Sequence, residues 1–352
     1  MKKLILLGVL LIQCSSLATE HTVQLNGAMS AGVNGYHVPN DQQYKQVDVA
    51  FNLDLTIPLS NDVEGFFQLQ GGAGGSYLGF PGPEAVLTDI NVAYTPEGQP
   101  YSFVFGSFDT PFGQYTNRLT NNADMSANLF VKNPLLYTTF AGAVGTLNTL
   151  GIMTNYNHPL FTATLALTNG TAESAQNDDG NFGTVIRLVS KVKGISDFSI
   201  SYLTANDAGN TDSFNSNVSG WMLDIDKDIF ERLALRSYFS SFTYNDKNSS
   251  TNDDISSMLL ECVYHFETYS LGFRYDSYQR DDQTTVNSDI PVNFLSYSAL
   301  TSGNVYANFE AYSFGYLRPL QKDVELKAET FLESGDSEQK ALGSIIYVTF
   351  FF

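Results

Sequence analysis

The chain has few cysteines, few histidines and few basic side chains. Its 352 residues include 2 cysteines, 4 histidines and 18 lysines and arginines, against 37 aspartates and glutamates. So acidic a chain is a poor candidate for binding nucleic acid or an anionic membrane surface. Four scattered histidines argue against a zinc or haem site, so no metal and no cofactor are expected. No Gly-x-Ser-x-Gly motif accompanies them, so we expect no enzyme.

Long apolar runs are also missing. A membrane-spanning helix needs about 20 consecutive apolar residues, and no segment after residue 18 approaches this length. The short apolar run at 4–12 follows Lys2 and Lys3 and precedes Ser16-Leu17-Ala18, the order found in a secretory signal peptide. We expect residues 1–18 to be removed. Residues 19–352 would then be one exported domain with Cys262 as its single cysteine and no internal disulfide.

Period-two alternation recurs along the chain, whereas helical periodicity is nearly absent. In QVDVAFNLDL, residues 46–55, every odd position is apolar, while the even positions include Asp48 and Asp54. Successive side chains of a strand lie on opposite faces, so this segment predicts a strand with one apolar and one polar face. The same pattern returns at 101–105, 161–167, 197–203, 270–276 and 323–331.

Short and long connections alternate strictly between these segments. The long polar connections are expected at 34–45, 71–86, 108–148, 169–182, 205–217, 245–254, 277–303 and 334–341. A meander with tight turns on one rim and long loops on the other is typical of outer-membrane barrels. The pattern therefore predicts an all-β fold, a transmembrane antiparallel up-and-down β-barrel of about 16 strands in the bacterial outer membrane.

The chain ends on IIYVTFFF, with no polar tail. On this last strand Phe350 and Phe352 are two residues apart, so their side chains lie on the same face, which we expect to contact lipid. A terminal aromatic residue of this kind is similar to the signal that the barrel assembly machinery reads. We expect this strand to close against the first strand, near residues 23–33, so that no sheet edge is left. The expected surroundings are outer-membrane lipid and lipopolysaccharide.

Two short stretches suggest a family. GSFDTPFG, residues 106–113, resembles the G-x-x-x-x-P-F-G segment of phosphate-selective-type porins and of the related siderophore porin family. LALTNG, residues 165–170, resembles the strand-ending Asn-Gly of the same porins. The resemblance implies a 16-stranded pore, often a homotrimer, that admits small solutes. The chain departs from it in one respect, because phosphate selectivity requires a cationic lumen and basic residues are few here.

The alternation also predicts which charged residues line the lumen. The basic ones are Arg187, Arg236, Arg274 and Lys327. The acidic ones are more numerous: Asp48, Asp54, Glu64, Asp224, Asp226, Glu261, Asp276, Glu310, Glu325 and Glu329. The 108–148 segment is too long for an ordinary loop and is rich in large apolar residues, so we expect it to fold inward and narrow the pore. Its charges, Asp109, Arg118, Asp124 and Lys132, are the candidates for the constriction.

These observations together predict a porin, a water-filled channel for passive diffusion of small solutes. An acidic lumen should favour cations or neutral solutes, or be weakly selective. Two other functions are compatible with the sequence. One is siderophore uptake without TonB, which the family resemblance suggests. The other is a surface adhesin or structural barrel that spans the membrane without conducting.

Overall fold

The computed structural model describes residues 22–38, 42–73, 86–113, 129–130, 148–168, 182–191, 197–211, 214–230, 232–246, 252–280, 308–335 and 340–352. The expected signal peptide, residues 1–18, lies outside these ranges. No helix among the described residues is long and apolar enough to cross a membrane.

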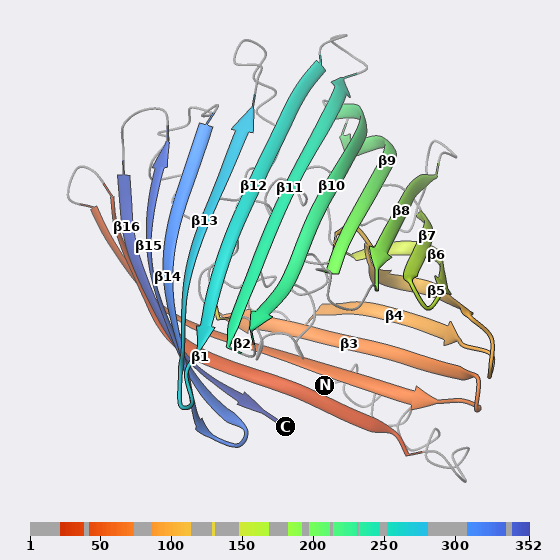
Figure 1. Ribbon diagram of the computed structural model, residues 1–352, viewed down its shortest axis with the longest axis horizontal. Helices are drawn as coiled ribbons and strands as arrows, with labels where there is room; N and C mark the ends of the chain where they lie inside the picture. Colours follow the sequence, from red (N-terminus) through yellow and green to blue (C-terminus); the bar gives the residue numbers. More distant parts are fainter. Residues whose placement is uncertain are drawn as a thin grey trace.

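The described residues form sixteen antiparallel strands that close into one barrel (Figure 1). Each strand pairs with its neighbours along the chain, and β1 pairs with β16. The strands are β1 (Gln24–Val38), β2 (Gln42–Pro58), β3 (Val63–Ala73), β4 (Val86–Tyr94), β5 (Tyr101–Asp109), β6 (Asn148–Asn157), β7 (Phe161–Thr168), β8 (Gly183–Ser190), β9 (Asp197–Thr211), β10 (Phe214–Phe230), β11 (Leu233–Asp246), β12 (Asn252–His265), β13 (Ser270–Arg280), β14 (Asn308–Gln321), β15 (Val324–Gly335) and β16 (Lys340–Phe351). The predicted fold class and strand count are confirmed.

Two of the predicted long connections are shorter than expected. The strands β9 and β10 continue through most of 205–217, and β1 and β2 leave only residues 39–41 between them. In the first case the pairing of β10 with β9 has register irregularities on both sides of Ser216. Such irregularities interrupt the alternation of side chains, which is the signal on which the sequence-based boundary depended.

Side chains alternate between the two faces of the wall. In β16, Leu342, Ile346 and Phe350 are 55%, 49% and 41% exposed, whereas Ile345 and Tyr347 are at most 1% exposed. The same alternation runs along β14. Because the exposed set is apolar and the barrel has no open edge, its outer surface suits the hydrocarbon of a bilayer.

Aromatic rings cover glycines on the inner face at three places. Gly32 lies directly opposite Tyr347, Gly220 opposite Phe242, and Gly343 opposite Phe331. A Cβ atom on any of these glycines would approach the facing ring to within 2.1–2.5 Å. Each glycine therefore makes room for a cross-strand ring, a contact that fixes the strand register.

The last residue completes the closure. The backbone N–H of Gly27 donates to the carbonyl of Phe352 at 2.8 Å, and the N–H of Phe352 donates to the carbonyl of Gly27 at 3.0 Å. The Phe352 ring lies over Gly27, where a Cβ atom would meet it at 2.6 Å. The apolar C-terminus is thus part of the β1–β16 seam, as the sequence predicted.

Replacing Gly32 by valine should weaken this seam, because the new side chain would overlap the Tyr347 ring and the Ile346 carbonyl. We expect a loss of about 1–3 kcal/mol in the free energy of unfolding. Urea titration of the refolded barrel, followed by its migration on an unheated gel, measures this loss. Ala31→Val on the exposed outer face is the control, with a change within about 0.5 kcal/mol. Equal stability of the two variants would contradict the prediction.

Candidate channel lumen

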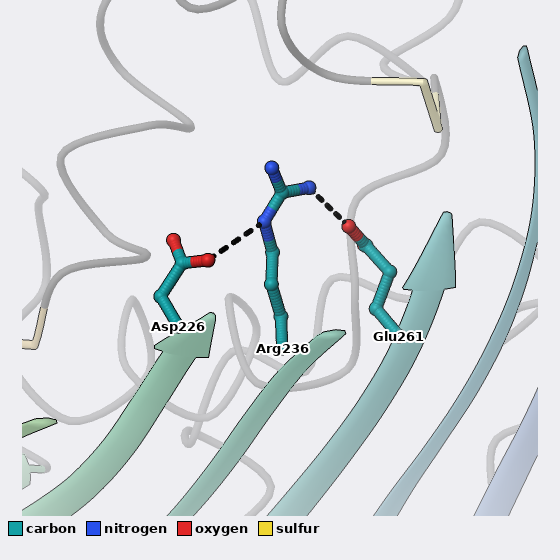
Figure 2. Close-up of polar contacts among 3 residues, drawn as sticks. All are labelled: Asp226, Arg236 and Glu261. Atoms are coloured by element: carbon teal, nitrogen blue, oxygen red, sulfur yellow. Dashed lines mark hydrogen bonds and ion pairs between the residues drawn. The ribbon is translucent and has the colours of Figure 1, made fainter. Parts of the chain in front are cut away.

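A row of alternating charges crosses the inner wall of four adjacent strands. Asp226 of β10 lies opposite Arg236 of β11, which lies opposite Glu261 of β12, which lies opposite Arg274 of β13. Figure 2 shows Arg236 between its two carboxylates, with its Nε 3.5 Å from Asp226 and its Nη1 bonded to Glu261. Because opposite charges alternate along the row, much of each charge is neutralised by its neighbours.

The row continues onto β15 through Arg274. Its Nε is 3.1 Å from Asp276, and its Nη2 is 3.4 Å from Glu329. The Arg274 side chain is 1% exposed, and both carboxylates are fully covered. Lys327 lies 3.9 Å from Glu325 on the same strand. Every basic side chain of the inner wall from β11 to β15 therefore lies beside a carboxylate in the described part of the chain.

The strands β2–β7 place no lysine or arginine on the described inner wall, and their single lysine, Lys45, lies on the outer face. Residues 46–113, which form most of β2 and all of β3–β5, include no lysine or arginine, and neither do β6 and β7. Two inward carboxyls of these strands have amide or hydroxyl partners. Asp54 accepts from Gln68 Nε2 at 3.0 Å, and Asp89 accepts from Ser107 Oγ at 3.3 Å. Asp89 also interacts electrostatically with Asp54 and Asp109.

The chain leaves β5 and turns onto the inner wall at the GSFDTPFG motif. Gly106 and Gly113 have φ of 123° and 71°, values that favour glycine. The N–H of Gly113 donates to Ser201 Oγ at 2.9 Å, and Arg187 Nη1 donates to the Gly113 carbonyl at 3.1 Å. Phe112 is completely buried, with its ring 5.3 Å from that of Phe242. The motif therefore anchors the beginning of the 108–148 segment inside the barrel.

A second contact of this segment lies on β13 and β14. Gly272 and Gly315 face each other across these strands, and a Cβ atom on either would meet Leu129 and Phe130 at 2.0–3.2 Å. The Arg274 guanidinium lies 4.7 Å from the centroid of the Phe130 ring, a cation–π contact. We call Gly272 and Gly315 the glycine socket. It receives two large apolar side chains from a segment that begins on the opposite side of the wall.

Most of the predicted lumen residues lie on the inner face. The inward ones are Asp54, Arg187, Asp224, Asp226, Arg236, Glu261, Arg274, Asp276, Glu325, Lys327 and Glu329. Glu64 has the same parity but is exposed next to a tight turn. Asp109 ends β5 beside Asp89. Arg118, Asp124 and Lys132 lie outside the described residues, and so does the side chain of Asp48.

The prediction that Glu310 faces the lumen is wrong. It is exposed on the outer face of β14, while its neighbours Phe309 and Ala311 are buried inside. Its carboxylate accepts from the hydroxyls of Tyr275 and Tyr312 at 3.2 and 3.4 Å. A charge is tolerated there because Glu310 lies at the end of β14 nearest the long 277–303 connection, beyond the apolar part of the strand. Phe350 and the terminal Phe352 are exposed on the outer face.

Sequence reasoning missed three features of the interior. Asp89 was overlooked because the alternation is poor before residue 90. The glycine socket gives no signal in a single sequence. The third feature is a buried apolar cluster on the inner face that includes Phe242, Leu259 and Tyr278, where polar residues were expected. Many outward residues of β11–β13 are apolar too. Apolar and polar residues therefore do not alternate along these strands as they do in an amphipathic strand.

A closed sixteen-stranded antiparallel barrel with an apolar outer face and a charged inner wall has the architecture of outer-membrane porins. No family model matches the chain, and no curated protein matches its sequence. Solved structures do match it. One is the anion-selective porin from Comamonas acidovorans, with a TM-score of 0.69 at 12% identity over 95% of this chain and 100% of that one.

Two further structures are similar. OprB of Pseudomonas putida has a TM-score of 0.67 at 14% identity and covers 94% of both chains. The outer membrane channel DcaP of Acinetobacter baumannii has a TM-score of 0.65 at 13% identity, over 94% of this chain and 97% of that one. Identities this low show a shared fold. The resemblance to phosphate-selective or siderophore porins stays a prediction.

Replacing Arg236 by glutamine should destabilise the barrel, because Asp226 and the buried Glu261 would lose their cationic partner. We expect the free energy of unfolding to fall by about 3–5 kcal/mol, measured by urea titration in lipid vesicles. Arg232→Gln is the matched control. Its ion pair with Glu267 is 3.7 Å long and mostly exposed, so its loss should cost at most about 1 kcal/mol. Similar losses in both variants would contradict the structural role of the charge row.

Proposed function

We propose that this chain is an outer-membrane porin through which small solutes diffuse passively. The observation that carries the proposal is the charged inner wall of a closed barrel whose outer face is apolar. A purely structural barrel would be at least as stable with apolar residues in place of these charges, because burying charge costs free energy even when the charge is paired. A conducting pore uses such groups to interact with passing solutes.

The proposed channel favours cations or neutral solutes. Support comes from residues 46–113, which contain no lysine or arginine and bring Asp54, Asp89 and Asp109 near one another, while Arg236 and Arg274 are neutralised by carboxylates. The porin from Comamonas acidovorans is described as anion-selective. The charges of this chain argue for the opposite preference.

The 108–148 segment is proposed to form the constriction. Its anchor at Gly113 and its contact at the glycine socket lie on different parts of the inner wall, on β8–β10 and on β13–β14. A segment attached at both places crosses part of the bore. Asp109, Arg118, Asp124 and Lys132 are its charged residues and stay the candidates for contact with solutes.

Siderophore uptake and a non-conducting adhesin are the alternatives. Block of the current by a ferric siderophore at low concentration would favour the first, and a silent insert in a planar bilayer would favour the second. Assembly as a homotrimer and recognition of Phe350 and Phe352 by the barrel assembly machinery stay predictions. Migration on a gel with and without heating tests the oligomer, and deletion of Phe352 tests the assembly signal.

Neutralising Asp54 and Asp89 together should reduce the preference for cations. A unit charge about 10 Å from the ion path in water is worth about 0.4 kcal/mol, or roughly twofold in permeability. Each unit of charge that is lost should lower the potassium permeability and raise the chloride permeability by this factor. We therefore expect the potassium-to-chloride permeability ratio of Asp54→Asn/Asp89→Asn to fall by about fourfold for each unit of negative charge that the pair carries. The reversal potential in planar bilayers under a salt gradient measures this ratio.

The control for this measurement is Glu97→Gln, which removes an exposed charge from a tight turn and should leave the reversal potential unchanged. A wild-type channel that prefers anions would refute the proposed selectivity while leaving the porin proposal intact. Absence of any conductance would refute the porin itself.

Filling the glycine socket tests the constriction. In Gly315→Val the new side chain would overlap Leu129 and push the 108–148 segment off the wall and into the bore. We expect lower single-channel conductance and more frequent brief closures than in the wild type. Phe314→Leu, the next residue on the outer face of the same strand, is the control. Wild-type conductance in Gly315→Val would show that the segment does not set the width of the channel.

A further inference from the structure

The outer face of β16, β1 and β2 carries a long apolar band. Its outward positions include Leu342 and Ile346 on β16, Val33 on β1 and Val47 on β2, which are 55%, 49%, 52% and 66% exposed. These residues are neighbours across the strands, since Val33 lies opposite both Ile346 and Val47. The band is the surface that acyl chains would contact in a bilayer.

Basic side chains stand directly above this band, towards the long connections. The next outward residue beyond Val47 is Lys45, and the next beyond Leu342 is Lys340. On β1, His37 follows Val33 after one intervening glycine, Gly35. All three side chains are exposed. We call His37, Lys45 and Lys340 the outer basic patch.

The three residues of the patch lie at about the same height in the wall. Strands of a barrel tilt, so residues at one height are displaced along neighbouring strands and are not directly opposite. The rim at the tight turns shows the direction of this displacement. Phe351, at the end of β16, pairs with Ala28, whereas β1 extends further towards this rim, to Gln24.

The outer basic patch follows the same displacement. Lys45 lies opposite Gly35, two residues from His37, and His37 lies opposite Leu342, two residues from Lys340. Each is a diagonal neighbour of the next, roughly 7–8 Å away. Gly35 and Ser344 leave space beside His37, while Leu342 lies opposite it, so an anion beside His37 can be approached by a lysine from each side.

Three other strands place neutral or acidic groups at the described positions of the corresponding ends. Asp254 on β12 and Glu310 on β14 are exposed there, and β11 has Thr243 and Asn245. The concentration of basic groups on β16, β1 and β2 is notable in a chain with 18 lysines and arginines against 37 acidic residues. A cationic patch above an exposed apolar band is complementary to an amphiphile with a negatively charged head and several acyl chains.

We propose that the outer basic patch binds the phosphorylated head of lipopolysaccharide, with its acyl chains along the apolar band below. The inference rests on the proposed function only in that it requires the barrel to stand in the outer membrane. Lys45 and Lys340 supply charge-assisted hydrogen bonds to phosphate oxygens, and His37 supplies a ring N–H. The aliphatic stems of the lysines lie along the band while their ammonium groups stay in water.

The test is a titration of the purified, refolded barrel in an uncharged detergent with bisphosphorylated lipid A, read by native mass spectrometry. We expect one tightly bound lipid A on the wild type. Lys45→Gln/Lys340→Gln should bind it at least about tenfold more weakly, and Lys45→Arg/Lys340→Arg should bind it like the wild type. Lys191→Gln/Lys322→Gln removes two exposed lysines from the opposite rim and is the matched control, with binding unchanged.

Two further ligands separate the contributions of head and chains. Lipid A without phosphates should bind as weakly to the wild type as lipid A does to Lys45→Gln/Lys340→Gln, and glucosamine phosphate without acyl chains should not compete.

Equal lipid A binding by all variants would overturn the proposal. So would an oligomer that dissociates in Lys45→Gln/Lys340→Gln, because a second copy would then cover the patch. Conductance of these variants in planar bilayers tests the porin proposal separately, since neither lysine faces the lumen.

Discussion

The need to pair every backbone polar group within the wall determines the rest of this structure. Hydrocarbon offers no hydrogen bonds to a free strand edge, so the sheet must close on itself. The last pair of bonds joins Gly27 to Phe352, and the aromatic C-terminus covers this glycine from outside. The apolar end of the chain is therefore a structural element of the seam, and its exposure to lipid is a consequence of where the seam lies.

Closure also divides every strand into two faces with different requirements. The outer face needs only apolar side chains, and its regularity made the fold and the strand count predictable from one sequence. The inner face must combine close packing with charge, and it does so by two means. Rings of Tyr347, Phe242 and Phe331 lie over glycines, and Arg236 and Arg274 lie between carboxylates. Both depend on which residues face each other across strands.

This dependence explains which residues of the site were predictable. Parity along a single strand was enough for Asp226, Arg236, Glu261 and Arg274, but it did not show that they form one row. Parity was misleading for Glu310, because beyond the apolar part of β14 a charge on the outer face meets water or head groups and costs little. The glycine socket depends on Leu129 and Phe130, which are far from Gly272 and Gly315 in sequence, and local patterns carry no information about such contacts.

The distribution of charge matters more for selectivity than its total. On β10–β15 the inward Arg236 and Arg274 are each compensated by carboxylates a few ångströms away, so this part of the wall presents mainly dipoles to a passing ion. On β2–β5 no lysine or arginine shares the described inner face with the inward carboxyls, since Lys45 faces outward and residues 46–113 contain none. We propose that this distribution makes the field across the lumen asymmetric and attracts a cation towards β2–β5. Because an acidic net charge could equally arise from surface loops, this asymmetry is the stronger physical argument for cation preference.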